Sequence, residues 1–214
     1  MSNRYWTKAH AHYSRQDWIN KPSIFSEFAI QYFPKTGKIL DLGAGQGQDS
    51  RFFAENGLDV VSTDFEDFAL GLNETNIPAH LKKKIKVEEV DLSKKLPYIN
   101  QEFDVVYSHL ALHYFDTATT KEIFKEIKRV LKIGGIIAFM VNSTSDPEYQ
   151  TGTLIEKDFF AMEKNINMRF FNVDTVKEFT KDFKTISVDN LGESYKDSAV
   201  GIHNMIRYIG KKVE

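Results

Sequence analysis

Three glycines at alternate positions make residues 39–51, ILDLGAGQGQDSR, the segment best suited to chemistry. They follow an apolar run and an acidic residue, an arrangement typical of loops that hold a nucleotide-like cofactor. In the GxGxxG loop of dinucleotide-binding proteins, the third glycine lets a helix pack closely on a strand. Counted from Gly43, Gln48 occupies that third place. The spacing therefore disfavours an NAD(P)-dependent oxidoreductase.

Four further residues have types and positions that suit a cofactor or a reaction. Asp64 follows the glycine loop at the distance from which a carboxylate accepts both ribose hydroxyls, and Phe65 beside it can cover an adenine face. His109 and His113 are four residues apart, so one helical turn would put them on the same face. Either imidazole can accept a proton from a nucleophile or simply hydrogen-bond to backbone. The pair lacks the glutamate and further ligands of a zinc site, so we expect no metal.

Seven short runs rich in β-branched and aromatic residues are the elements that must position these side chains. Helical patterns and loops separate the first five runs, which predicts an α/β fold: a doubly wound, seven-stranded, mostly parallel sheet with helices on both faces. Residues 192–201, which join the last two runs, are too few for a crossover helix, so the last strand should be antiparallel. The runs are residues 38–43, 59–64, 85–91, 103–109, 135–141, 185–191 and 203–210.

The loop DLGAGQG resembles the acidic-x-GxGxG motif of class I (Rossmann-like) S-adenosylmethionine-dependent methyltransferases at each defining position. Other landmarks of that family follow in order: Asp64 after the second run, Asp91 after the third, FDVVYSHLALHYF for the fourth and LKIGG before the fifth. The resemblance covers residues 39–141 and extends to the last two strands by topology. It implies S-adenosyl-L-methionine as the cofactor.

The same resemblance implies roles for individual residues. The glycine loop would hold the methionine and ribose parts of the cofactor, with Asp41 near its amino group. Asp91 and Leu92 would meet the adenine, although an Asp-Leu pair also begins an ordinary turn. Ser108 would lie where the fourth strand reaches the methyl donor. With Tyr13 from the N-terminal arm, the expected cofactor-binding residues are Asp41, Gly43, Ala44, Gly45, Gly47, Asp64, Phe65, Asp91, Leu92, Ser108 and Tyr13.

Two aromatic-rich segments lie outside this pattern. The N-terminal arm carries Tyr5, Trp6, Tyr13 and Trp18, and residues 142–173 form an insertion that we expect to be irregular. In an open α/β sheet the ligand binds beyond the carboxyl ends of the strands, where such segments cap it. Aromatic faces also suit a cationic sulfonium. We expect a lid over the site, with packing as ordinary core as the alternative.

The composition limits both class and location. With 214 residues we expect one domain: an aromatic arm and lid helix (1–36), a cofactor core (37–141), a substrate-side insertion (142–173), and a last helix with a C-terminal hairpin (174–214). The absence of cysteine excludes iron–sulfur and cysteine-nucleophile chemistry and suits a reducing compartment. A net charge of −2 and the lack of long apolar runs argue against nucleic acid and membrane partners, so we expect a cytoplasmic protein.

These features together predict methyl transfer to a small-molecule acceptor by in-line displacement. An amine or thiol acceptor can react without a base, whereas a hydroxyl needs one, and His109 and His113 are the catalytic candidates. The Asn/Asp-Pro-Pro-Tyr signature of nucleobase amino methylation is absent. Arg169 suits an anionic substrate group or a surface salt bridge equally well. The alternatives are an RNA or protein methyltransferase and a non-catalytic S-adenosylmethionine-binding module.

Overall fold

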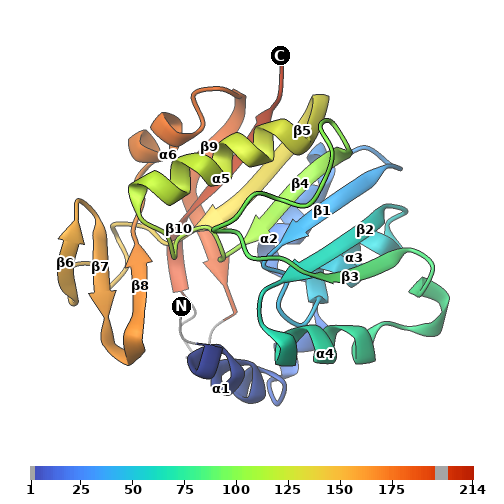
Figure 1. Cartoon of the computed structure of the whole chain (residues 1–214), viewed down its shortest axis with the longest axis horizontal. Coiled ribbons are helices and arrows are strands. Elements are labelled where there is room, and N and C mark those ends of the chain that lie inside the picture. The colour runs from blue at the N-terminus through green and yellow to red at the C-terminus, as the bar shows by residue number, and fades with distance from the viewer. Residues whose placement is uncertain (1–2, 196–201) are drawn as a thin grey trace.

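Residues 3–195 and 202–214, which the computed structural model describes, contain a sheet of seven strands in the order β3-β2-β1-β4-β5-β10-β9 (Figure 1). The strands are β1 (Lys38–Leu42), β2 (Asp59–Asp64), β3 (Ile85–Glu89), β4 (Phe103–His109), β5 (Leu131–Val141), β9 (Lys184–Ser194) and β10 (Ile202–Lys211). Strands β1 to β5 pair in parallel, whereas β10 runs antiparallel to both β5 and β9. The predicted doubly wound sheet with an antiparallel last strand is confirmed.

Helices cover both faces of the sheet, as predicted (Figure 1). The helices are α1 (Asn3–Tyr13), α2 (Ile24–Ala29), α3 (Gln48–Glu55), α4 (Asp67–Asn76), α5 (Thr117–Val130) and α6 (Val173–Phe179), with the short 3-10 helices η1 (Asp17–Asn20), η2 (Ile30–Tyr32), η3 (Ala79–Leu81) and η4 (Glu163–Asn165). Helices α2 and α3 share a core with Ile39 of β1, and α5 and α6 share the other core with its neighbour Leu40, as alternation along a strand requires. Within the described residues, no helix has the length and apolar character needed to cross a membrane.

The insertion is more ordered than the sequence suggests, and the expectation of an irregular segment is wrong. Its second half forms a separate antiparallel sheet of β6 (Thr153–Glu156), β7 (Phe159–Met162) and β8 (Ile166–Arg169), which projects beside the main sheet in Figure 1. Asp158 and Asn165 turn the chain between these strands with φ values of 58° each. Asp and Asn enter this left-handed conformation more readily than most side chains. Strands of four residues are too short for their alternation to stand out in a sequence.

The N-terminal arm is also ordered, because it folds into helix α1 and then η1. Helix α1 lies at the bottom of Figure 1, beyond the edge of the main sheet. Its Tyr5 packs against the core of the three-stranded sheet, and so does Tyr114 from the turn after β4. The arm and the insertion therefore meet over the same end of the main sheet.

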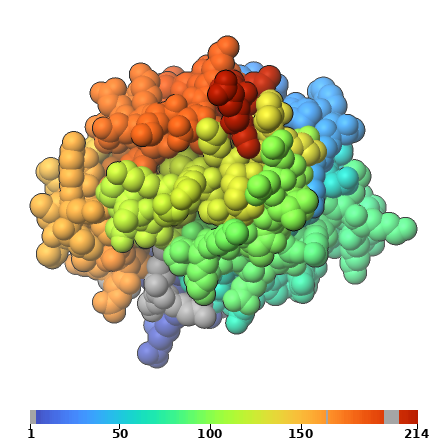
Figure 2. Space-filling view, turned by 45° about the horizontal axis from the view of Figure 1, so that its top comes forward, coloured from blue at the N-terminus to red at the C-terminus, as the bar shows by residue number. Residues whose placement is uncertain are grey.

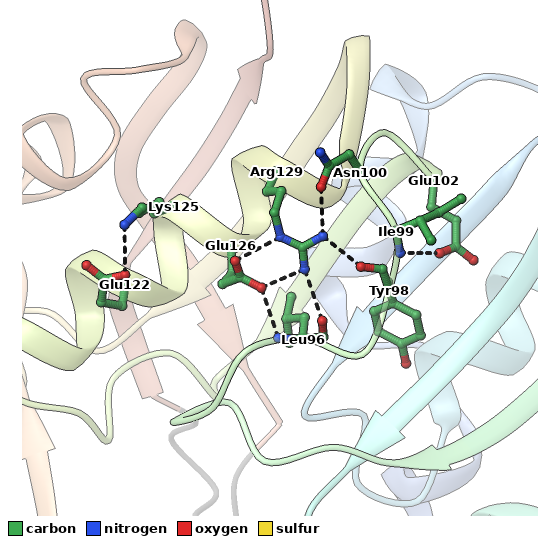
Figure 3. Close-up of polar contacts among 9 residues, drawn as sticks. All are labelled: Leu96, Tyr98, Ile99, Asn100, Glu102, Glu122, Lys125, Glu126 and Arg129. Carbon is green, nitrogen blue, oxygen red and sulfur yellow. Dashed lines mark hydrogen bonds and ion pairs between the residues drawn. The ribbon is translucent and has the colours of Figure 1, made fainter.

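A partly buried arginine, Arg129, holds the segment between β3 and β4 against α5, where the two lie side by side in Figure 2. Arg129 donates hydrogen bonds to the carbonyl oxygens of Leu96 and Tyr98 at 3.0 and 2.7 Å and to Asn100 Oδ1 at 3.0 Å (Figure 3). Its guanidinium also pairs with Glu126, whose Oε2 accepts from the amide of Leu96 at 2.9 Å. One charged pair thus satisfies backbone groups along a segment that has no regular structure.

We predict that Arg129→Ala lowers the free energy of unfolding by about 2 kcal/mol, because several charge-assisted bonds are lost and partly buried carbonyl groups lose their donor. Lys125→Ala is the matched control. That lysine lies on the same helix and bonds to exposed Glu122 at 3.2 Å, so its removal should change the free energy by less than about 0.5 kcal/mol. Urea denaturation followed by circular dichroism measures both, and equal losses would contradict the role of Arg129.

Candidate active site

A cavity of about 1210 Å³ lies where the carboxyl ends of the parallel strands meet the N-terminal helix. Its walls come from the glycine loop after β1, the turns after β2, β3 and β4, helix α1 and the three-stranded sheet. This edge of an open α/β sheet is the usual place for a ligand. The two segments expected to form a lid both contribute to the cavity wall.

The glycine loop needs each glycine for a different neighbour. All three have positive φ values, of 73° at Gly43, 54° at Gly45 and 73° at Gly47. A Cβ at Gly43 would collide with the side chain of Ala111, and a Cβ at Gly45 would lie 3.0 Å from His10 Cε1. Gly47 instead begins α3 and faces α4, so it does not line the cavity. Backbone conformation and close packing therefore both require glycine here.

The carboxylate of Asp64 joins the glycine loop to the turn after β2. Its Oδ2 accepts from the amide of Gly45 at 2.9 Å, and its Oδ1 accepts from the amides of Phe65 and Glu66 at 2.8 and 3.1 Å. Burial raises its pKa, while nearby His10 and these amides act in the opposite direction. A carboxylate held at a strand end in this way can accept hydrogen bonds from a pair of ribose hydroxyls.

Two more buried carboxylates lie beneath the glycine loop. Asp41 Oδ2 accepts from Ser50 Oγ at 2.6 Å, and its pKa is raised well above the ordinary value by burial and by neighbouring Asp49. Asp49 accepts from the amide and hydroxyl of Ser23 and from the hydroxyl of Tyr107, each at 2.7 Å. Both carboxylates line the cavity, where they suit a positively charged group. Asp49 was missed in the sequence, although an acidic residue in the first turn after a glycine loop was the available signal.

Most of the predicted site residues come together in this cavity. Those that line it are Asp41, Gly43, Ala44, Gly45, Asp64, Phe65, Asp91, Leu92, Tyr13 and His109. Asp91 also forms its own turn, since its Oδ1 accepts from the amide and the hydroxyl of Ser93 at 2.9 and 2.6 Å. An ordinary turn and a place in the cavity wall are therefore compatible at this residue.

Three of the predicted site residues lie behind the cavity wall: Gly47, Ser108 and His113. Ser108 is 1% exposed and donates from Oγ to the carbonyl of Leu42 at 2.8 Å, which ties β4 to β1. His113 is equally buried, and its carbonyl accepts from the amide of Arg169 at 2.7 Å. Among the residues that the structure describes, no cluster of three His, Asp or Glu side chains could hold a metal ion.

Arg169 is neither a ligand for an anion nor part of a surface salt bridge. It is 4% exposed, pairs with Glu156, and donates to the carbonyl of Phe115 at 3.1 Å and to Thr117 Oγ1 at 3.0 Å. Its guanidinium lies 5.1 Å from the ring centroid of Phe159. This arginine fixes the three-stranded sheet to the start of α5, and it is absent from the cavity wall.

Helix α1 docks on the cofactor loop through residues that no sequence pattern identified. Gln46 Nε2 donates to the carbonyl of His10 at 2.9 Å, and Thr7 Oγ1 donates to Glu66 Oε1 at 2.7 Å. His10 is 9% exposed, and burial lowers its pKa. Within the described part of the chain, His10 Nδ1 and Gln46 Oε1 are buried without a hydrogen-bond partner, and both residues line the cavity. The cavity therefore offers polar atoms that a ligand can satisfy.

Together, the sheet order, the antiparallel strand and the glycine loop define a Rossmann-like domain of the class I methyltransferase type. Residues 40–139 match the profile of a methyltransferase domain family. An uncharacterized methyltransferase of Synechocystis sp. is 37% identical over 103 residues, which cover 48% of this chain and 46% of that protein. The sarcosine/dimethylglycine N-methyltransferase of Aphanothece halophytica is 33% identical over 115 residues, or 51% and 39% of the two chains. The chain thus spans about half the length, or less, of these curated relatives.

Solved structures share the fold over most of the chain. The 1,6-didemethyltoxoflavin-N1-methyltransferase of Burkholderia thailandensis has a TM-score of 0.74 at 17% identity. The alignment covers 99% of this chain and 87% of that protein. A methyltransferase of Methanosarcina mazei has a TM-score of 0.72 at 19% identity, with 87% and 97% covered. The match of residues 40–139 and the shared fold agree with the prediction from the glycine loop, a class I methyltransferase with S-adenosylmethionine as its cofactor.

The residues present fit this cofactor. Gly43 and Gly45 line the cavity, the carboxylate of Asp64 suits a pair of ribose hydroxyls, and Asp41 and Asp49 suit the amino group. The unpaired atoms of the buried cavity wall are available to the remaining polar groups of the molecule.

We predict that Gly43→Ala lowers the free energy of unfolding by about 2 kcal/mol, because the residue needs a positive φ and its Cβ would overlap Ala111. Its affinity for S-adenosylhomocysteine should fall about tenfold or more, since the loop must move. Gly71→Ala is the control: a Cβ there meets nothing within 4 Å, and alanine should stabilise α4 by up to about 1 kcal/mol. Denaturation and calorimetry test both, and an unchanged affinity in Gly43→Ala would contradict the assignment of this loop.

Proposed function

We propose that this protein transfers a methyl group from S-adenosylmethionine to a small molecule bound in the capped cavity. The observation that carries the proposal is that helix α1 and the three-stranded sheet both wall the cavity, together with the strand ends that bear the glycine loop. A macromolecular acceptor needs an open surface around the reacting atom, whereas a cap of this kind suits a compact molecule. The match of residues 40–139 to the methyltransferase family supports the chemistry.

In this proposal each wall of the cavity binds a different part of the cofactor. Asp64 accepts from the ribose hydroxyls, Phe65 and Leu92 contact the adenine, and Asp41 with Asp49 binds the amino group. When bound, the cofactor supplies an electrophilic methyl group: the acceptor's lone pair forms the new bond to carbon, and the electrons of the broken carbon–sulfur bond stay on sulfur. The protein's contribution is alignment and exclusion of water.

His109 is the proposed proton acceptor. It lies at the end of β4, lines the cavity, and its ring stacks with Phe25 at a centroid distance of 6.4 Å and an angle of 17°. The predicted role of His113 is less well supported, because its buried side chain is not part of the cavity wall. A base at the end of the central strand adjoins the loop that holds the methyl donor.

The names of two relatives support a small acceptor. The similar protein of Aphanothece halophytica is a sarcosine/dimethylglycine N-methyltransferase, and that of Burkholderia thailandensis is a 1,6-didemethyltoxoflavin N1-methyltransferase. Both names describe methylation of nitrogen in a small molecule. An RNA or protein acceptor, and a module that binds the cofactor without turnover, are the competing proposals. Transfer of labelled methyl into a pool of metabolites distinguishes turnover from binding alone.

We predict that the protein binds S-adenosylmethionine and S-adenosylhomocysteine more tightly than NAD in calorimetric titrations. Asp64→Ala should weaken the binding of S-adenosylhomocysteine about tenfold or more, because the ribose hydroxyls lose a charged acceptor. The control is Asp59→Ala at the other end of β2, where an exposed carboxylate pairs with Lys84 at 3.3 Å. Tighter binding of NAD would contradict the proposed function. Unchanged binding in Asp64→Ala would contradict only the ribose assignment.

His109→Asn should lower kcat about a hundredfold or more, because no side chain is then left to take the proton from the acceptor. Its affinity for S-adenosylhomocysteine should stay near that of the wild type, which shows that the cavity is intact. His80→Asn is the control, since His80 is exposed and bonds to Glu55 away from the cavity. Initial rates of labelled methyl transfer measure the effect. A rate equal to the wild-type rate would remove His109 from the mechanism.

A further inference from the structure

The cavity has an aromatic wall formed by Tyr5, Trp6 and Tyr114. The ring centroids of Tyr5 and Trp6 are 5.0 Å apart at 80°, and those of Trp6 and Tyr114 are also 5.0 Å apart at 80°. All three residues line the cavity, and Tyr5 and Tyr114 also pack on the core of the three-stranded sheet. Aromatic walls of this kind bind apolar groups and cations.

Charges in the cavity wall have one sign. The described residues that line it include seven carboxylates and no lysine or arginine, in a chain with 28 basic and 30 acidic residues. The carboxylates are Asp41, Asp49, Asp64, Asp91, Asp116, Glu148 and Glu163. The first four lie at the glycine loop and the ends of β1 to β3, where the cofactor binds. Asp116 comes from the turn after β4, and Glu148 and Glu163 come from the insertion, so these three lie outside the segments assigned to the cofactor.

Glu148 lies within electrostatic reach of the aromatic wall. Burial raises the pKa of both Tyr5 and Tyr114, and the negative charge of Glu148 adds to the increase in each. Glu148 itself is exposed at the cavity mouth, next to the strands of the small sheet. Aromatic rings with an adjacent carboxylate form a typical binding site for an ammonium group.

Polar atoms without partners indicate that the same cavity is built for a ligand. His10 is 9% exposed and Gln46 is 2% exposed, and both line the cavity. Within the described residues, His10 Nδ1 and Gln46 Oε1 have no hydrogen-bond partner. Buried polar atoms are costly unless they are satisfied, so a bound ligand with polar groups would stabilise this arrangement.

We propose that the methyl acceptor is an amine with an apolar body, whose nitrogen is received by Tyr5, Trp6, Tyr114 and Glu148. This inference rests on the proposed function and names its substrate class. A carboxylate or phosphate acceptor would enter a cavity with seven acidic side chains and no lysine or arginine among its described lining residues, which is electrostatically unfavourable. An amine has the complementary charge in solution and a stem that suits the aromatic wall.

The net charge inside the cavity does not change when a bound amine is methylated. The bound ammonium first loses a proton to His109, and the neutral nitrogen then forms a bond to the methyl carbon. As the carbon–sulfur bond breaks, its electron pair remains on sulfur, and one positive charge passes from sulfur to nitrogen. The carboxylates therefore stabilise the reacting pair before and after transfer, and no negative intermediate forms beside them.

The test uses three probes with the same aromatic body: phenethylamine, 2-phenylethanol and 3-phenylpropionate. Each is titrated calorimetrically into the protein saturated with S-adenosylhomocysteine. Phenethylamine should bind about tenfold more tightly than 3-phenylpropionate, with the neutral alcohol between them, because cation–π and ionic contacts favour the ammonium group. Equal binding of the three probes, tighter binding of 3-phenylpropionate, or no binding of phenethylamine would overturn the proposal.

Variants identify the residues responsible. Glu148→Gln should reduce the preference for phenethylamine over 3-phenylpropionate about threefold or more, while the affinity for S-adenosylhomocysteine is kept. Glu122→Gln, at an exposed glutamate of α5 outside the cavity wall, should leave the preference unchanged. Tyr114→Leu should weaken phenethylamine, whereas Tyr114→Phe, which keeps the ring, should not. An unchanged preference in Glu148→Gln would overturn the role of that residue.

The two proposals fail in different ways. A protein that does not bind S-adenosylhomocysteine contradicts the proposed function before any acceptor probe is added. A protein that binds S-adenosylhomocysteine and methylates some other compound, yet does not prefer phenethylamine to 3-phenylpropionate, contradicts only the amine assignment. Labelled methyl transfer to phenethylamine would support both.

Discussion

The carboxylate of Asp64 is the junction on which the rest of the site depends. It accepts backbone amides from Gly45 on one side and from Phe65 and Glu66 on the other, so it fixes the glycine loop relative to the turn after β2. Glu66 in turn accepts from Thr7 of α1 and also caps α4 by accepting from the amide of Ala69 at 2.8 Å. The glycine loop, helix α4 and helix α1 therefore share one network of hydrogen bonds, in which each part limits the position of the others.

The site concentrates negative charge at a cost to folding. Burial raises the pKa values of Asp41 and Asp64, which means that their charged forms are less stable here than in water. Hydroxyl and amide donors such as Ser50 and the amide of Gly45 offset part of this cost. A positively charged ligand offsets more of this cost, because its charge neutralises the carboxylates, whereas hydrogen-bond donors only solvate them. The same groups that weaken the fold therefore strengthen the binding of a cation.

The sequence was most informative where patterns are long and physical requirements are strict. The strands of the main sheet and the residues Gly43 and Asp64 were predictable, because a buried parallel strand, a positive φ and a carboxylate at a strand end each restrict the residue type. The three-stranded sheet was not predictable, since its strands have four residues each. Helix α1 and His10 were missed because the aromatic residues are spread along the whole arm, so no single apolar face with helical spacing stands out. Ser108 and Gly47 were assigned by their place in a motif, and motif position does not say which side of the cavity wall a side chain occupies.

The cofactor is better defined than the acceptor because different segments of the chain form different parts of the cavity wall. Residues 40–139, which match the family profile, supply the glycine loop, Asp64 and the end of β4. Many other residues of the cavity wall come from α1 and from the insertion, which lie outside that match, and Tyr114 is a point where the two parts meet. A shared core that binds one cofactor can serve many acceptors when the capping segments vary. Charge and aromatic content of those segments, more than the fold, are then the properties that select the acceptor.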